Sequence, residues 1–146
     1  MSSEGWNDRG WRRWFELTAV LRSFPGLAIG VVGASGVDSR GANGEAASFL
    51  EQQIGHVRGE WSSERLASDP RIAAGRAAYQ AFGAKPKRHH SSMESLLQAI
   101  LSGRSIPSVN PLVDLNNAIS LRHVIPVGGD DLDPNGRRHP LDDRDC

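Results

Sequence analysis

The sequence predicts an α+β domain with an α/β-like arrangement, in which helices pack on a small mixed sheet. Residues 27–32 form a short apolar run that is rich in β-branched residues and bounded by glycines, and this composition indicates a buried strand. Several later segments carry apolar residues at helical spacing. A lone strand leaves its backbone groups unpaired. Because residues 124–127 offer only a short second strand, we expect an incomplete unit.

Overall composition permits one domain but does not select a function. The chain has 146 residues, and its 17 basic residues balance its 17 acidic ones. Their distribution is uneven: residues 69–92 hold five cations and one acid, whereas residues 130–146 hold six Asp and three Arg. This split fits a basic binding face with a solvated acidic tail, and it equally fits ordinary surface charge.

The cysteine content and the apolar stretches favour a cytoplasmic protein with no membrane partner. Cys146 is the only cysteine, so no internal disulfide can form. The first ten residues contain acids and lack an apolar core, so no signal peptide is expected. The longest apolar stretch, residues 27–34, is far shorter than the roughly 20 residues of a membrane helix.

Residues 1–23 are predicted to be an N-terminal extension with an amphipathic helix. Their large side chains recur at helical spacing, and Pro25 and Gly26 end the pattern: Trp11, Trp14, Phe15, Thr18 and Leu21. We interpret the tryptophans as packing residues rather than as a platform for bases. After the expected strand, residues 33–44 are rich in Gly, Ser and Asn and indicate a loop.

Two helices are expected next. Residues 45–66 carry an apolar face, made of Ala46, Phe49, Leu50, Ile54, Val57 and Trp61 with the polar Gln53. Asp69 followed by Pro70 is typical of a helix start, because the acid caps free N–H groups and proline needs none there. Ile72, Gly75, Tyr79 and Phe82 would share one face, and Gly83 can end this helix in a left-handed conformation.

Two more helices follow. Ser91 and Glu94 form a capping-box pattern before an apolar face of Leu96, Leu97, Ile100 and Leu101, with Gly103 as the end. In an incomplete domain we expect this face to be poorly covered. Asn110 and Pro111 repeat the cap and proline start, and Leu112, Leu115 and Ile119 then form an apolar stripe before Pro126.

A set of short motifs runs in a fixed order through residues 24–133. They are Tyr-x-x-Phe-Gly at 79–83, Lys-Pro-Lys at 85–87, Ser-x-x-Glu at 91–94, Asn-Pro-Leu-Val-Asp at 110–114, Asn117, Pro-Val-Gly-Gly at 126–129 and Asp-Leu-Asp at 131–133. Their order and spacing resemble the B3/B4 domain, the tRNA-binding editing module of the phenylalanyl-tRNA synthetase beta subunit. The likeness is closest to the free-standing relatives of that module.

The resemblance implies an RNA-binding module for tRNA or aminoacyl-tRNA, with no cofactor and no complete ligase activity. Lys85, Lys87, Arg88 and His89 are the expected phosphate-binding residues, since cations on a loop supply sequence-independent affinity. A solvated surface loop is the competing interpretation. Two alternatives stay open for the whole chain: a free-standing deacylase that edits aminoacyl-tRNA in trans, and an inactive truncated product.

The chain departs from the family pattern in two places. Pro126 and Asp131 match the ends of a Pro-x-His-x-x-Asp loop, but the histidine position holds Gly128, which cannot transfer a proton. The family also continues past Asp133 with more strands. We therefore expect residues 24–133 to be a partial B3/B4-like domain, followed by a mobile acidic tail at residues 134–146.

A second candidate set consists of polar and glycine positions near the expected last helix: Asn110, Asp114, Asn117, Gly128, Gly129, Asp131 and Asp133. Asp114 and Asn117 are three residues apart and so share a helix face. They would contact a bound aminoacyl end or, as we favour, tie the helix to the Gly128–Gly129 loop. Residues 131–142 have the spacing of a calcium loop, but without an incoming helix we expect no metal site.

Overall fold

The computed structural model describes residues 22–34, 36–83 and 90–130. The chain divides into two units after Val37, so residues 22–37 belong to one and residues 38–130 to the other. In the described residues the regular elements are helices, and none of these residues is in a strand. The prediction of an α+β domain with a small mixed sheet is therefore wrong for the described part of the chain.

The expected strand at residues 27–32 is an exposed segment without regular structure. Leu27, Ile29 and Val32 are 41, 51 and 95% exposed. The segment follows a turn in which the Leu27 N–H donates to the Phe24 carbonyl over 3.0 Å. β-Branched residues favour a strand only where cross-strand neighbours pack against them, and the described residues supply no such neighbour. Local composition alone was therefore insufficient to make a strand.

The predicted helix over residues 45–66 is two helices, α2 (Gly44–Glu60) and α3 (Ser63–Ser68). Asn43 caps α2 by accepting from the N–H groups of Glu45 and Ala46. The break falls at Ser62, whose hydroxyl accepts from the Arg65 N–H over 3.2 Å and so starts a new helix. The Arg65 guanidinium lies 4.6 Å from the ring centre of Trp61, which packs the junction.

Helix α4 (Pro70–Ala81) begins and ends where the sequence predicts. The Asp69 carboxylate accepts from the Arg71 N–H over 2.9 Å, and Gly83 has a φ of +79° after the last turn. The prediction of one apolar packing face along this helix is wrong, however. Ile72 is buried, but Tyr79 is 37% and Phe82 is 64% exposed. The helix is therefore anchored near its start and presents its end to solvent.

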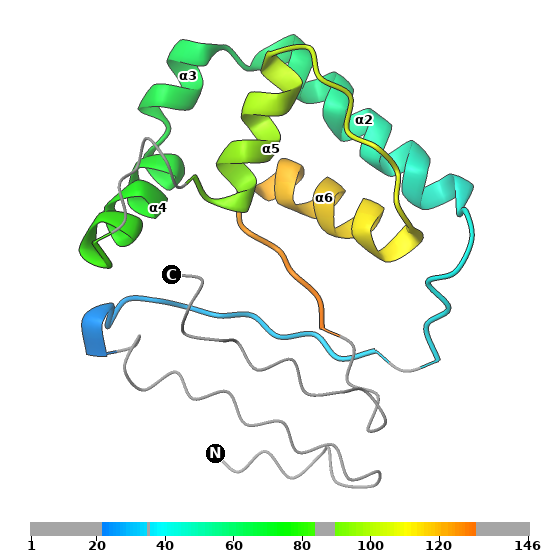
Figure 1. Cartoon of the computed structure of the whole chain (residues 1–146), viewed down its shortest axis with the longest axis horizontal. Helices are drawn as coiled ribbons and strands as arrows, with labels where there is room; N and C mark the ends of the chain where they lie inside the picture. The colour runs from blue at the N-terminus through cyan, green and yellow to red at the C-terminus, as the bar shows by residue number, and fades with distance from the viewer. Residues whose placement is uncertain (1–21, 35, 84–89, 131–146) are drawn as a thin grey trace, which may run out of the picture. The chain divides into compact units, whose positions relative to one another are not determined.

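Helices α5 (Ser92–Leu101) and α6 (Pro111–His123) complete the helical unit with α2 (Figure 1). α2 runs beside α6, and α5 packs on both. The core gathers apolar side chains from these helices, with additions from α3, α4 and the segment after α6: Leu50, Ile54, Val57, Trp61, Leu66, Ile72, Met93, Leu97, Ile100, Ala118, Leu121 and Val124. The expectation that the α5 face is poorly covered is wrong, because Leu97 and Ile100 are fully buried.

Helix α6 faces the core with a different side from the one that its apolar stripe predicts. Leu112 and Leu115 are each 40% exposed, whereas Asp114 and Leu121 are buried. The inward side also carries Ala118, whose small side chain lets α6 lie close to α2. Asp114 turns inward because its carboxylate has hydrogen-bond donors there, in the segment before the helix.

Candidate nucleic-acid interface

The predicted phosphate-binding residues Lys85, Lys87, Arg88 and His89 lie outside the described residues. The structure does describe both ends of the loop that carries them. The loop leaves the last turn of α4 and returns at the first turn of α5. Side chains on α4 and α5 hold these two helices together.

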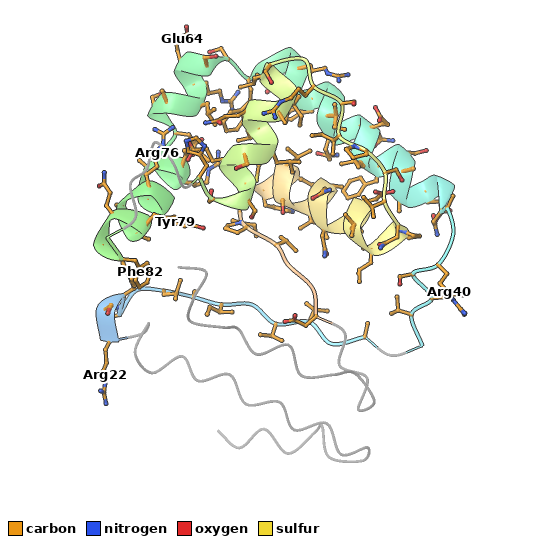
Figure 2. The ribbon with its side chains drawn as sticks, in the orientation of Figure 1. Arg22, Arg40, Glu64, Arg76, Tyr79 and Phe82 are labelled. Carbon is orange, nitrogen blue, oxygen red and sulfur yellow. The ribbon has the colours of Figure 1, made fainter. Side chains whose placement is uncertain are left out.

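A buried carboxylate on α5 joins the start of that helix to Arg76, which Figure 2 labels on α4. Glu94 is 1% exposed, and its Oε1 accepts from Arg76 Nη2 over 2.8 Å and from Arg76 Nε over 3.2 Å. Gln98 Nε2 donates to the same oxygen over 3.1 Å. Because Arg76 and Glu94 lie on opposite sides of the loop in sequence, their ion pair links its two ends.

The capping-box prediction at α5 is half confirmed. The Ser91 hydroxyl accepts from the Glu94 N–H over 3.2 Å, as the pattern requires. The Glu94 side chain binds Arg76 instead of reaching back to the first residues of the helix. Sequence analysis missed this pair. The available signal was an arginine in the middle of an alanine-rich helix, 18 residues before a carboxylate on an otherwise apolar helix face.

His90 adds a third nitrogen-bearing group next to this carboxylate. Its Nε2 lies 3.9 Å from Glu94 Oε1, and its side chain is 31% exposed. The hydrogen bond to Glu94 raises the pKa of the Arg76 guanidinium above its ordinary value. Arg76 therefore stays charged, and the link between α4 and α5 keeps its positive partner at every physiological pH.

A second ion pair neutralises the acid at the start of α4. Asp69 is 8% exposed and accepts from Arg71 Nη2 over 2.7 Å and from Arg71 Nε over 3.0 Å. Arg71 Nη1 also donates to the His123 carbonyl over 3.3 Å, which joins α4 to the end of α6. The hydrogen bonds from Arg71 lower the pKa of Asp69 below its ordinary value, so this acid stays ionised and paired.

These two pairs leave the loop as the source of the net charge in the stretch from Asp69 to Glu94. The sequence has no acid from Pro70 to Met93, and the acids on either side, Asp69 and Glu94, are buried against Arg71 and Arg76. Paired charges of opposite sign largely cancel at a distance. The three remaining cations of this stretch, all in the loop, therefore have no acid near them in sequence to offset them.

Two aromatic side chains lie just before the loop. Figure 2 labels Tyr79 in the last turn of α4 and Phe82 at the cap that follows it. Both are exposed, although sequence analysis assigned them to an apolar packing face. The sequence could not separate these outcomes, because an aromatic residue at helical spacing has the same pattern whether its face is covered or open.

The predicted polar set lies mainly at the start of α6. Asn110 accepts from the Val113 N–H over 2.9 Å, which makes it the N-cap of the helix. Asp114 is 1% exposed and accepts from the Ser108 hydroxyl and from the Val109 N–H. These bonds tie the helix to the segment before it, so the prediction that Asp114 binds the Gly128–Gly129 loop is wrong.

The other members of the polar set are spread over α6 and the segment after it. Gly128 and Gly129 are exposed, and Asn117 is half-buried. Asn116 is the α6 side chain that lies next to the Gly128–Gly129 segment. A Cβ added to Gly129 would be 3.2 Å from Asn116 Nδ2. Asp131 and Asp133 lie outside the described residues, as do the other residues with calcium-loop spacing.

None of the helices in the described part of the chain combines the length and the apolar composition that crossing a membrane requires. Nor do its His, Cys, Asp and Glu side chains gather into a group of three that could hold a metal ion.

The described arrangement holds its buried acids inside the helical unit and exposes two aromatic side chains near the loop in sequence. Its most buried acids, Glu94 and Asp114, are held by hydrogen bonds inside the helical unit. The exposed groups near the loop are aromatic rings, which suit contact with a flat or apolar ligand.

Comparison of the chain with protein-family models, with curated proteins and with solved structures finds no match.

Proposed function

We propose that this chain is a cytoplasmic RNA-binding module that holds tRNA or aminoacyl-tRNA through the loop between α4 and α5. The contact residues are Lys85, Lys87, Arg88 and His89. One observation carries the proposal: the acids that border this basic stretch are buried and already paired. From Asp69 to Glu94 there are five cations and two acids, a formal charge of +3, and the two pairs cancel, so the excess belongs to the loop.

An excess of unpaired cations on a loop suits a polyanion. Lysine ammonium groups and an arginine guanidinium bind phosphate oxygens without reading bases. Both ends of the loop are attached to helices that the Arg76–Glu94 pair holds together. The motif order in residues 24–133, which resembles the B3/B4 module, supports tRNA as the class of RNA.

Binding is proposed in preference to catalysis. In the deacylase hypothesis, polar groups on α6 would hold the aminoacyl ester and a water molecule. Asn110 and Asp114 instead bond to backbone and side-chain groups at the start of α6. Ester hydrolysis therefore stays a separate hypothesis, which release of amino acid from mischarged tRNAs would test.

Filter binding of tRNA at several salt concentrations tests the proposal. We expect the triple variant Lys85→Ala/Lys87→Ala/Arg88→Ala to bind more weakly. The slope of log affinity against log salt should also fall by about 2, since each lost phosphate contact removes about 0.7.

A matched control removes the same charge elsewhere: Arg22→Ala/Arg40→Ala/Arg58→Ala, three exposed arginines outside the basic stretch. This control should keep the wild-type slope. Equal losses in the two triple variants would show that net charge, and not the loop, determines affinity. A wild-type chain that does not bind tRNA at low salt would refute the proposed function itself.

A further inference from the structure

Residues 27–34 combine exposed apolar side chains with a free backbone. Val31 and Val32 are 74% and 95% exposed, the highest values among the large apolar side chains of the described chain. Figure 1 draws the segment as an open stretch of ribbon, and it has no helix or strand. Among the described residues, no hydrogen bond uses a backbone N–H or C=O of residues 28–34. This is the chemistry of an unpaired sheet edge.

We infer that residues 27–33 of two copies of this chain pair as antiparallel strands around Gly30, so that the protein forms a symmetric dimer. Free backbone donors and acceptors in a row are matched by another extended segment, which offers the same groups at the same repeat. The strand forms only in the dimer, so the described part of the single chain keeps its helical fold. The inference does not depend on RNA binding.

The composition of the segment favours a second copy as its partner. No charged residue lies between Arg22 and Asp38, so the segment offers no group that would select an acidic or a basic strand. An uncharged apolar strand satisfies both the backbone and the side chains, and every copy of the chain supplies one. Because each copy uses the same residues, the pair closes on itself with two-fold symmetry.

The order of large and small side chains fits one register. With Gly30 opposite Gly30 of the second copy, Ile29 lies opposite Val31, and a cross-strand pair of β-branched residues is stabilising. Ala28 then lies opposite Val32, so a small side chain faces a larger one. A ribbon of two strands is only marginally stable, so we expect association that depends strongly on protein concentration.

Cysteine crosslinking in a Cys146→Ser background tests the register. Gly30→Cys places two thiols on directly opposite residues, about 4.5–5.5 Å apart between Cα atoms, which a disulfide spans. Ala34→Cys lies opposite Gly26 in this register, so its two thiols are about 27 Å apart. We expect oxidation to give the covalent dimer at least about tenfold faster with Gly30→Cys than with Ala34→Cys. Ser48→Cys, at an exposed position of α2, should be as slow as Ala34→Cys.

Sedimentation equilibrium of the full chain over a range of concentrations tests the contact itself. Ile29→Lys/Val31→Lys places like charges opposite one another and should weaken dimerisation at least about tenfold. Ile29→Glu/Val31→Lys places opposite charges across the pair and should dimerise more tightly than the double-lysine variant. Ser48→Lys/Ala74→Lys adds the same charge at exposed helix positions and should dimerise like the wild type. Circular dichroism checks that each variant keeps its helices.

Several results would overturn the inference. The first is a wild type that stays monomeric at every concentration, and the second is a particle larger than a dimer, which would mean open-ended pairing. Equal crosslinking of Gly30→Cys and Ala34→Cys would contradict the antiparallel register. A double-lysine variant that dimerises like the wild type would place the contact elsewhere on the chain. None of these results alters the test of tRNA binding.

Discussion

At the scale of single residues, Val124 has the least usual backbone of the described chain. Its φ and ψ are 55° and 47°, and among described residues it is the only one besides glycines with a positive φ. A β-branched residue is strained in this left-handed region, where helix ends usually have glycine. Val124 is 5% exposed and belongs to the core, so burial of its side chain offsets the strain.

The substitutions Val124→Gly and Val124→Ala test this balance. Both remove the buried side chain, but only glycine also removes the backbone strain. We expect both to destabilise the protein and the alanine variant to be less stable than the glycine variant by about 1 kcal/mol. Urea denaturation measures the difference. An alanine variant as stable as the glycine variant would show that Val124 is not strained in solution.

The Asp69–Arg71 pair predicts a dependence of stability on pH. The hydrogen bonds from Arg71 lower the pKa of Asp69 in the folded state. Its contribution is therefore complete above the unfolded pKa of about 3.9 and is lost as the pH falls through the lower folded value. We expect Asp69→Asn to cost about 1 kcal/mol at pH 7, since Arg71 is partly exposed, and less as the pH falls below about 4.

Urea denaturation of the wild type and Asp69→Asn from pH 2 to pH 7 measures this difference. Asp38→Asn is the matched control. Asp38 also binds an arginine two residues later, and its hydrogen bonds with Arg40 lower its pKa, but both side chains are exposed. This control should leave stability unchanged at every pH. A constant difference between the wild type and Asp69→Asn across the range would contradict the pairing.

At the scale of elements, α4 depends on polar contacts more than on apolar ones. Ile72 is its buried apolar residue. Arg71 reaches the His123 carbonyl at the end of α6, and Arg76 reaches Glu94 on α5. These contacts fix α4 against two helices without an apolar stripe along its length.

Removal of one partner from the Arg76–Glu94 pair leaves a charge in a buried position. We expect Arg76→Met to destabilise the protein by about 2–3 kcal/mol, because Glu94 is then held by Gln98 and by the more distant His90 alone. The double variant Arg76→Met/Glu94→Leu should cost less than the sum of the single variants. A double-mutant cycle in urea measures this, and strict additivity would show that the pair does not couple α4 to α5.

At the scale of the whole helical unit, α6 has an apolar stripe that does not reach the core. Leu112 and Leu115 are exposed, while Leu121 on the other side is 2% exposed. The core consists of α2, α5 and the inward side of α6, with smaller additions from α3 and α4. Apolar residues of α6 are thus divided between packing and the surface.

Two substitutions test which side of α6 is buried in the core. Leu121→Ala should cost about 3 kcal/mol through the cavity that it leaves. Leu115→Ser should change stability by about 0.5 kcal/mol or less, because its side chain already meets solvent. Thermal or urea denaturation measures both, and a larger loss for Leu115→Ser than for Leu121→Ala would reverse the assignment of the two sides.

Local sequence determined where α4, α5 and α6 begin and where α4 and α5 end. Asp69–Pro70, Ser91 and Asn110–Pro111 start helices and Gly83 and Gly103 end them, as predicted, and both glycines have a positive φ. These signals are read within a few residues, because a cap needs only its own side chain and the nearest N–H groups. The basic stretch that carries the proposed RNA contacts was also visible in the sequence, as a run of cations without acids.

Tertiary structure alone decided which faces are buried and which charges are paired. Residues 27–32 have strand composition but lack a neighbouring strand in the described part of the chain. α6 turns Asp114 inward and two leucines outward, because donors before the helix satisfy the carboxylate. The pairing of Arg76 with Glu94 spans 18 residues. Burial and pairing depend on partners that are distant in sequence, and spacing within one element does not specify them.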